Sequence, residues 1–310
     1  MQNRTICRLS QYWKKHKFFV QLVGTVILFA FLFSRISITS IIGNLGKINE
    51  LILLPLLLYP LGIYLSTLKW DMVMETKHKF LYLFQLYWIS NFFSNFLPST
   101  IGGDSYKLLK LKKYGLEKNF SAIILDRGSG IFSLLILLSI SFFPIYTLTK
   151  NQYLVLLPFI TLIGSAAAFW FFLTLTIRNK RIKKIQQVFK NNSNKLPLLL
   201  LLSILFIFLG SISFWIYFYM FGYALNFFNL FFVYILVRLI TLIPISVNGW
   251  GLKEGSLVYF VGFLGVPPDV AFSIALVARI ASLIATSGGG LIYLFRKLSK
   301  MTKLFQSGRE

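Results

Sequence analysis

Long apolar stretches separated by short polar segments make up most of the chain. A helix needs about 20 mostly apolar residues to cross a bilayer. Six stretches approach or exceed that length, at 18–38, 50–68, 120–146, 153–177, 197–225 and 270–295. The pattern therefore predicts an all-α polytopic integral membrane protein with about six full spans.

Two further apolar stretches, 80–97 and 230–247, are each interrupted by a proline and a glycine-rich segment. The first interruption, 97–104, reads Leu-Pro-Ser-Thr-Ile-Gly-Gly-Asp, and the second, 243–251, reads Ile-Pro-Ile-Ser-Val-Asn-Gly-Trp-Gly. Proline removes a helix donor and glycine favours non-helical backbone, so we expect continuous helix to fail at both places.

Composition agrees with a membrane protein. Of 310 residues, 56% are hydrophobic and 13% are charged, whereas a soluble domain has about a quarter charged residues. This excludes a soluble enzyme, a secreted disulfide scaffold and a disordered chain. The net charge of +23 points to anionic lipid rather than nucleic acid in so apolar a chain. With Cys7 as its one cysteine and two histidines, we expect no metal site and no cofactor.

The basic residues predict a topology, because they concentrate in cytoplasmic loops. Of the 32 Lys and Arg residues, 25 fall in five clusters: the tail 1–17, Lys69/Lys77/Lys79, 107–118, 178–195 and 296–309. If all five clusters are cytoplasmic, four basic residues lie outside and three lie within apolar segments. Residues 1–17 and 297–310 are then cytoplasmic basic tails around a membrane domain at 18–296.

The same topology predicts two re-entrant hairpins of opposite orientation. Residues 80–112 begin and end on the cytoplasmic side, whereas residues 230–266 begin and end outside. Each hairpin is followed by a Gly-hydrophobic turn and a span with one arginine near its start. The alternative is that two apolar Pro/Gly segments are alike by composition only. We favour an inverted repeat, an arrangement typical of transporters with broken helices.

Three arginines, Arg127, Arg238 and Arg279, lie within apolar segments, where a charge usually marks function. Arg279 shares a helix face with Ala275 and Ser282, and such small-residue faces pack against protein. We expect Arg127 and Arg279 to face a ligand, and Arg238 is equally compatible with a structural role. The alternative for each is an ion pair with Asp104, Asp126 or Glu254, or a side chain reaching the interface.

The glycine-rich breaks are the second group of candidates for binding a lipid headgroup. A helix that restarts after a break presents free N–H groups and a partial positive charge, which suit a phosphate. Asp104 is equally compatible with a simple N-cap. For Lys253 and Glu254, a structural salt bridge is favoured over a gate or a proton carrier. The candidates in and beside the breaks are Gly102, Gly103, Asp104, Asn248, Gly249, Gly251, Lys253 and Glu254.

Residues 178–195 form the longest basic loop, with seven Lys and Arg residues. An amphipathic helix bound to anionic lipid is one interpretation. We favour the other, a plain positive-inside loop.

The motifs around the breaks resemble those of a known family. The segments that carry the similarity are 95–104, 125–127, 243–255, 264–266 and 278–279. They resemble the flippase-like transmembrane region of lysylphosphatidylglycerol synthases, over about residues 18–296. The resemblance implies movement of a lipid between leaflets of a bacterial inner membrane. In the synthases a soluble domain performs aminoacylation. We do not expect that activity here, because the longest hydrophilic stretch of this sequence is too short for such a domain.

We therefore expect a lipid flippase, not an enzyme, whose substrate is a phospholipid, a polyprenyl phosphate or a glycolipid intermediate. Both termini are expected to be cytoplasmic, and a homo-oligomer is compatible with the sequence. Two alternatives stay open at this point. The chain could be a membrane-embedded enzyme acting on lipid, although it lacks an evident nucleophile–base set. It could also be a structural partner of a lipid-modifying or glycosylation complex.

Overall fold

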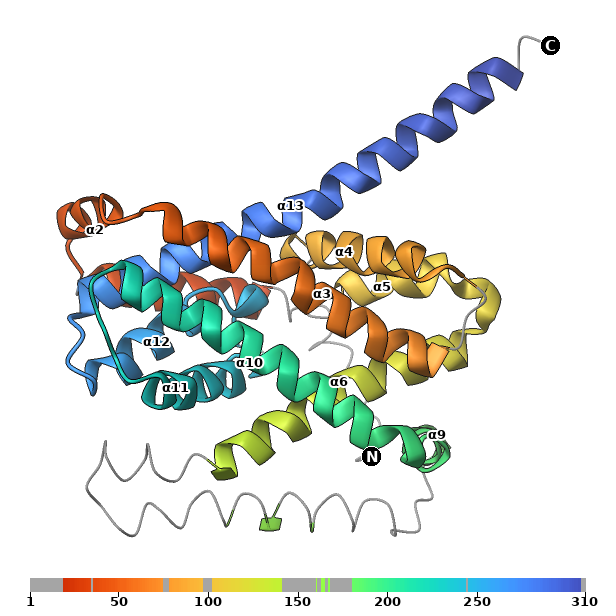
Figure 1. The fold of residues 1–310 in the computed structure, drawn as a ribbon, viewed down its shortest axis with the longest axis horizontal. Coiled ribbons are helices and arrows are strands. Elements are labelled where there is room, and N and C mark those ends of the chain that lie inside the picture. The colour runs from red at the N-terminus through yellow and green to blue at the C-terminus, as the bar shows by residue number, and fades with distance from the viewer. Residues whose placement is uncertain are drawn as a thin grey trace, which may run out of the picture.

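The fold is a bundle of crossing helices (Figure 1). The computed structural model describes residues 19–34, 36–74, 78–96, 102–140, 180–243 and 245–307, with a few single positions between 160 and 167. Every regular element in these residues is helical. The fold class predicted from the sequence, an all-α protein, is confirmed.

The first predicted span, 18–38, is not one straight helix. A helix at Phe19–Phe33 is followed by α2 (Ile38–Leu45), and the two are bent by 86°. The first of these helices ends at Phe33, about five residues before the predicted end of the span. The apolar pattern alone does not reveal this bend, because both sides of it are apolar.

The remaining helices form two sets in the same order. In each set a long helix is followed by two shorter helices and a second long helix. The first set is α3 (Leu53–Met74), α4 (Phe80–Phe96), α5 (Gly102–Lys110) and α6 (Leu116–Ile140). The second set is α10 (Leu196–Met220), α11 (Phe227–Ile240), α12 (Leu252–Gly262) and α13 (Pro268–Ser307). Between the sets lies α9 (Lys180–Asn191), and short 3-10 turns occupy Glu50–Ile52, Lys112–Tyr114, Ser193–Lys195 and Val247–Gly249.

The contacts between the two sets are reciprocal. Helix α4 packs against α13, and α11 packs against α6, so each hairpin contacts the last helix of the other set. The two leading helices, α3 and α10, pack against each other. Within each set the short helices pack as a pair, α4 with α5 and α11 with α12. The two predicted interruptions, 97–104 and 243–251, therefore fall between the paired arms of two helical hairpins. Residues 97–101 and 244 lie outside the described part of the chain.

Within the described residues, four helical segments are long and apolar enough to cross a membrane, or five if the bent first pair counts as one span. They are Glu50–Met74, Lys118–Ile140, Ser193–Met220 and Pro268–Leu298. Nearly all of the fourth predicted span, 153–177, lies outside the described residues. Helix α13 continues to Ser307, into the region predicted as a basic tail, and its C-terminal part projects from the bundle (Figure 1).

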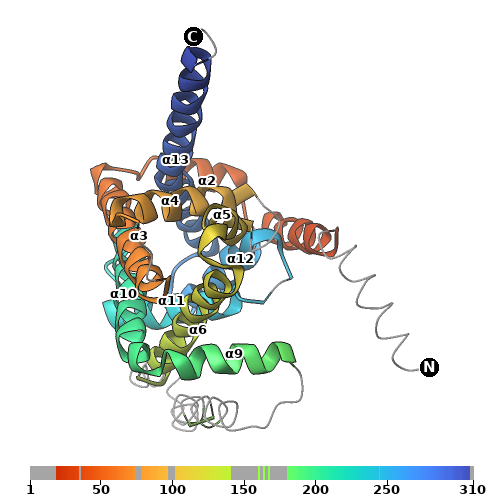
Figure 2. The same ribbon diagram turned by 90° about the vertical axis from the view of Figure 1, so that its right-hand side faces the viewer.

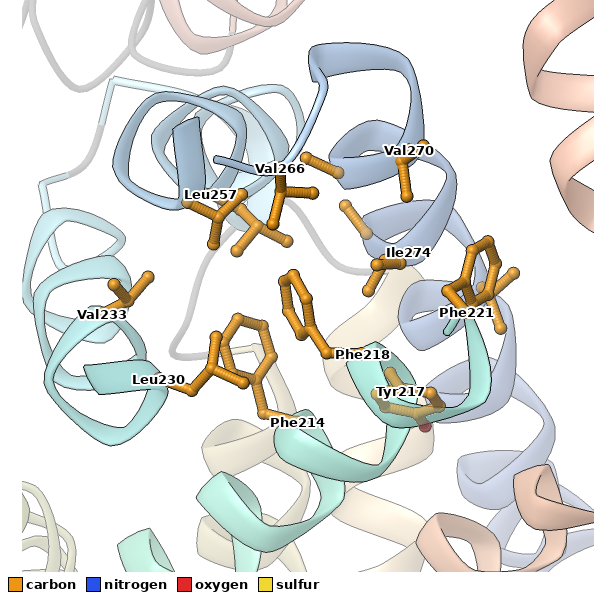
Figure 3. Close-up of a cluster of buried hydrophobic side chains, with 14 of the residues drawn as sticks. Phe214, Tyr217, Phe218, Phe221, Leu230, Val233, Leu257, Val266, Val270 and Ile274 are labelled. Atoms are coloured by element: carbon orange, nitrogen blue, oxygen red, sulfur yellow. The ribbon is translucent and has the colours of Figure 1, made fainter. Parts of the chain in front are cut away.

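The largest buried cluster joins the four helices of the second set. In Figure 3, Phe214 and Phe218 of α10 point into the space bounded by Leu230, Leu257 and Ile274, which belong to α11, α12 and α13. A second cluster, around Trp70, Leu86 and Leu125, joins α3, α4 and α6 of the first set. Each hairpin is thus anchored in apolar packing, which fixes the charged groups at its tip.

Helices α4 and α13 approach closely at a run of three glycines, Gly288–Gly290. A Cβ atom on Gly289 would lie 2.4 Å from the carbonyl oxygen of Trp88. We expect Gly289→Ala to lower the free energy of unfolding by about 1–3 kcal/mol, because the helices must separate to admit the methyl group. Gly130→Ala is the control, since no atom lies within 4 Å of its added Cβ, and it should be neutral or stabilising. Thermal unfolding in detergent measures both, and equal midpoints would contradict the close approach.

Candidate functional site

The tip of the first hairpin holds an ion pair between α5 and α6. Arg127 donates from Nε and Nη2 to Oδ2 of Asp104, at 2.9 and 2.5 Å. The other carboxylate oxygen of Asp104 pairs with Lys107, whose Nζ lies 2.8 Å away. Asp104 is the third residue of α5, so it is not the N-cap that was one reading of the sequence. It is held by two cations at once.

A second carboxylate, Asp126, extends this charged cluster toward the leading helices. It pairs with Lys69 of α3 at 2.7 Å and accepts a hydrogen bond from the Tyr87 hydroxyl at 3.0 Å. The Lys107 ammonium lies 4.1 Å from the centre of the Tyr87 ring, an attractive cation–π distance. Lys69 and Lys107 are almost fully buried. The two acid groups and their cations therefore form one connected network behind the hairpin tip.

Lys69 and Lys107 have a structural role that their place in the basic clusters did not predict. Lys69 and Lys107 were counted among the cytoplasmic loop clusters, but they lie within α3 and α5 and neutralise buried acids. A signal for Lys69 is present in the sequence, because the residues after it, Trp70 and Met72-Val73-Met74, continue an apolar helix. No local signal identifies Lys107, since its neighbours are those of a basic loop. The other basic residues of the five clusters still far outnumber the basic residues predicted to lie outside.

Arg127 stands at the edge of a pocket. Its side chain is 43% exposed although it pairs with Asp104. A cavity of about 290 Å³ lies beside the pair. Its walls come from α5 and from the N-terminal half of α6, and its lining residues are Asp104, Leu108, Phe120, Ile123, Ile124 and Arg127. The pocket thus combines one accessible guanidinium with an almost wholly apolar wall.

The tip of the second hairpin holds the corresponding ion pair. Arg279 of α13 donates from Nε and Nη2 to Oε1 of Glu254, at 3.0 and 2.7 Å. The guanidinium also lies 4.5 Å from the ring centre of Trp250 and donates to the carbonyl oxygen of Gly249. The second carboxylate oxygen of Glu254 accepts the backbone N–H of Gly251 at 2.8 Å. The backbone N–H at the start of α12 therefore donates to the carboxylate of Glu254. The sequence had suggested that the N–H groups at this helix start would bind a phosphate.

The two ion pairs follow one plan but differ in accessibility. In each set the second arm of the hairpin supplies the acid and the following helix supplies the arginine, 23 residues later in one set and 25 in the other. Arg279 is only 12% exposed and Glu254 only 1%. The structure brings Arg127 to a pocket and encloses Arg279. The ion-pair alternative, with Asp104 and Glu254 as the partners, is the arrangement that the structure contains.

The other two cations predicted at the site have no carboxylate partner within the described residues. The Arg238 guanidinium lies over the rings of Phe206 and Tyr234, at 5.7 and 5.8 Å from their centres. Lys253 was expected to pair with Glu254, but that carboxylate is held by Arg279. Lys253 is close enough to Arg238, Arg279 and Glu254 to interact electrostatically with all three. The second hairpin therefore has an excess of positive charge.

The glycines of the breaks have a structural explanation. A Cβ on Gly103 would lie 2.2 Å from the Ser90 carbonyl oxygen of α4, so this residue lets the two arms of the first hairpin meet. Gly102 begins α5 beside it. In the second break, Asn248, Gly249 and Gly251 all have positive φ, at 49°, 73° and 78°, which allows the chain to reverse before α12. Their spacing in the sequence thus reflects the hairpin turns.

Groups of three or more His, Cys, Asp or Glu side chains that could hold a metal ion are not found among the described residues. The charged side chains of both hairpin tips instead form ion pairs and cation–π contacts with one another. Of the two arginines in these pairs, Arg127 is accessible enough to exchange its carboxylate for another anion.

A comparison with protein-family models identifies the family of this chain. The model that describes the lysylphosphatidylglycerol synthase transmembrane region matches residues 18–290. The chain belongs to this family. No curated protein matches the chain in a sequence search. The match includes both hairpins, α3, α6 and α10, and most of α13, and it confirms the resemblance noted in the sequence. The chain is therefore an integral membrane protein of a family linked to anionic lipids.

Proposed function

We propose that this lysylphosphatidylglycerol synthase family member moves a phosphate-bearing lipid between the two leaflets of a bacterial inner membrane. The observation that carries the proposal is the pocket beside Arg127. A lipid with a phosphate headgroup is charged at one end and apolar along the rest. The pocket has the same division, with an accessible guanidinium at one side and the side chains of Leu108, Phe120 and Ile123 along its wall.

The ion pair provides a way to exchange the headgroup. Arg127 can form two parallel hydrogen bonds to a phosphate, as guanidinium groups do. When it turns from Asp104 to a phosphate, Asp104 keeps its bond to Lys107, so no carboxylate is left buried without a cation. The exchange therefore avoids the cost of an unpaired buried charge, which is several kcal/mol.

The proposal includes the membrane orientation of the hairpins. We place both as re-entrant elements that open to opposite sides of the bilayer and form an inverted repeat. The reciprocal packing of α4 with α13 and of α11 with α6 supports this arrangement. Broken helices at the interface of two repeats are where transporters of this kind bind their substrates.

A leaflet-resolved lipid assay in proteoliposomes tests the function. The purified protein is reconstituted with a fluorescent phosphatidylglycerol, and a membrane-impermeant reductant added outside reports the fraction of label in the outer leaflet. Transport predicts that labelled lipid crosses without chemical change. A new lipid product would favour the membrane-embedded enzyme, and unmoved, unmodified lipid would favour a structural partner. Either result would contradict the flippase.

The topology is a separate prediction. Both termini and the loops near 107–118 and 178–195 are expected on the cytoplasmic side, because basic residues concentrate there. Single cysteines at positions 113 and 184, in a Cys7→Ser background, should react with an impermeant thiol reagent only after the cells are opened. Labelling of either position in intact cells would contradict this topology and the predicted orientation of the hairpins.

A further inference from the structure

The first helix, Phe19–Phe33, lies along the second hairpin. Figure 2 shows it, in red, beside α12 at the side of the bundle. Its buried and half-buried positions recur every three or four residues and so share one face: Gly24, Thr25, Leu28, Phe29 and Leu32. On the opposite face, Val26 and Ile27 are 59% and 62% exposed. The first helix therefore packs on the protein mainly with one face, and its other face is apolar and exposed.

The packed face meets the backbone of the turn 245–251, between α11 and α12. A Cβ atom on Gly24 would lie 2.4 Å from the carbonyl oxygen of Ile245, so the helix and the turn touch backbone to backbone. One residue further along the helix, the Thr25 hydroxyl accepts a hydrogen bond from the Val247 N–H at 3.0 Å. These contacts fix the position of the turn relative to the first helix.

The same face supports the ring that covers Arg279. The centres of the Phe29 and Trp250 rings are 6.1 Å apart, and Trp250 in turn contacts the Arg279 guanidinium. A Cβ atom on Gly251 would lie 2.8 Å from the Cβ of Leu28, so the helix lies directly against the start of α12. The first helix therefore closes one side of the hairpin tip in which Arg279 is enclosed.

The first helix can leave this position at a lower cost than the ion pair behind it can open. The contacts of Leu28 and Phe29 are apolar, and lipid tails replace apolar contacts almost equally well. Opening the ion pair would instead leave a buried charge without its partner. In addition, Ser246 is 4% exposed, and its hydroxyl has no hydrogen-bond partner in the part of the chain that the structure describes. This hydroxyl gains hydrogen bonds when the turn opens to water.

We infer that the first helix is a gate over the second hairpin. It holds the turn 245–251 closed, with Thr25 and Phe29 as positioning residues. When the helix moves into the lipid, the turn opens and exposes the excess positive charge of this hairpin to anions, while the ion pair stays formed. A role of the gate in lipid movement rests on the function proposed above, but the gate itself can be tested without transport.

A cysteine in place of the buried Ser246 reports the opening of the turn. Ser246→Cys in a Cys7→Ser background is placed in phosphatidylcholine nanodiscs, and the rate of modification by a sulfonate-bearing methanethiosulfonate is measured. Thr25→Val keeps the shape of the side chain but removes the acceptor of the Val247 N–H. We expect it to raise the rate about three- to tenfold, the effect of losing one hydrogen bond.

Three controls separate gating from a general loss of structure. Thr25→Ser restores the acceptor and should return the rate to that of the Thr25 protein. Ile27→Ala removes apolar surface from the exposed face and should leave the rate unchanged. The thermal midpoint of Thr25→Val should stay close to that of the parent protein, because the rest of the bundle is untouched. Hydrogen exchange of the segment 245–251 gives the same comparison without the introduced cysteine.

The charge of the reagent tests what the gate exposes. A trimethylammonium-bearing methanethiosulfonate should modify the Thr25→Val protein more slowly than the sulfonate reagent does, because the hairpin has an excess of positive charge and attracts anions. Equal rates for Thr25→Val and Thr25→Ser would overturn the gate. Equal rates for the two reagents would overturn the exposure of a cationic site. Neither result depends on whether the protein moves lipid, so a failure of the gate is distinct from a failure of the flippase.

Discussion

Arg279→Ala is expected to lower the free energy of unfolding by about 3–5 kcal/mol, the cost of removing one partner of a buried ion pair. Glu254 is almost completely enclosed, and Arg279 is the cation that it contacts. Without the arginine, the hydrogen-bond donor left to this buried carboxylate among the described residues is the neutral Gly251 N–H. The Trp250 ring also loses the guanidinium that stacks on it. The change should show as a lower thermal midpoint and an aggregated fraction in size-exclusion chromatography.

The control removes both charges. Arg279→Gln/Glu254→Gln leaves no unpaired charge and keeps two amides that can hydrogen-bond, so it should recover much of the stability lost in Arg279→Ala. If Arg279→Ala unfolds at the wild-type temperature, the pair is not a stabilising element. Arg279 would then be a candidate for direct contact with the headgroup.

Arg127→Ala is expected to reduce lipid movement about ten- to a hundredfold while the protein stays folded. The rate effect corresponds to the loss of about 1.5–3 kcal/mol from a charged hydrogen bond to the phosphate. The effect on stability is expected to be small, because Arg127 is 43% exposed and Asp104 keeps Lys107 as its partner. The leaflet-resolved assay and the thermal midpoint, measured on the same preparation, separate the two effects.

Two further variants make the result specific. Arg127→Lys should retain part of the transport, since lysine keeps the charge but not the planar pair of donors. Arg296→Ala removes an arginine near the end of the α13 membrane segment, where it contacts Gln85 and the Tyr82 ring, and should transport at close to the wild-type rate. Normal transport by Arg127→Ala, or a loss that follows the loss of folded protein, would contradict the role proposed for this pocket.

These two predictions assign different roles to residues at equivalent places in the two sets of helices. Each arginine follows a hairpin and pairs with the acid near its tip. The acid of the first hairpin has two cations, and the acid of the second has one cation and a backbone N–H. The first pair can therefore open without leaving a charge unpaired, whereas the second cannot. We expect the arginine of the first pair to exchange its carboxylate for the lipid phosphate, and the second pair to stay closed and stabilise its hairpin.

The sequence by itself determined the features that depend on neighbouring residues. Apolar runs determine helices, and Pro and Gly at 97–104 and 243–251 determine the places where helix stops, because both effects act within a few residues. The small residues around Arg279 likewise indicated that it faces protein, and Ala275 beside it is buried. The motifs at the breaks were enough to indicate the family.

Only the tertiary structure decided which acid each arginine binds and how accessible the pair is. Asp104, Asp126 and Glu254 were all candidates in the sequence, and the choice depends on how α5, α6, α12 and α13 cross. The same holds for Lys69, which reaches Asp126 and also Ser203, 134 residues away. An ion pair is set by distances of a few ångströms between helices far apart in the chain, and hydrophobic periodicity contains no information on those distances. The difference between Arg127 at a pocket and Arg279 enclosed by Trp250 and Glu254 therefore comes from packing, not from local sequence.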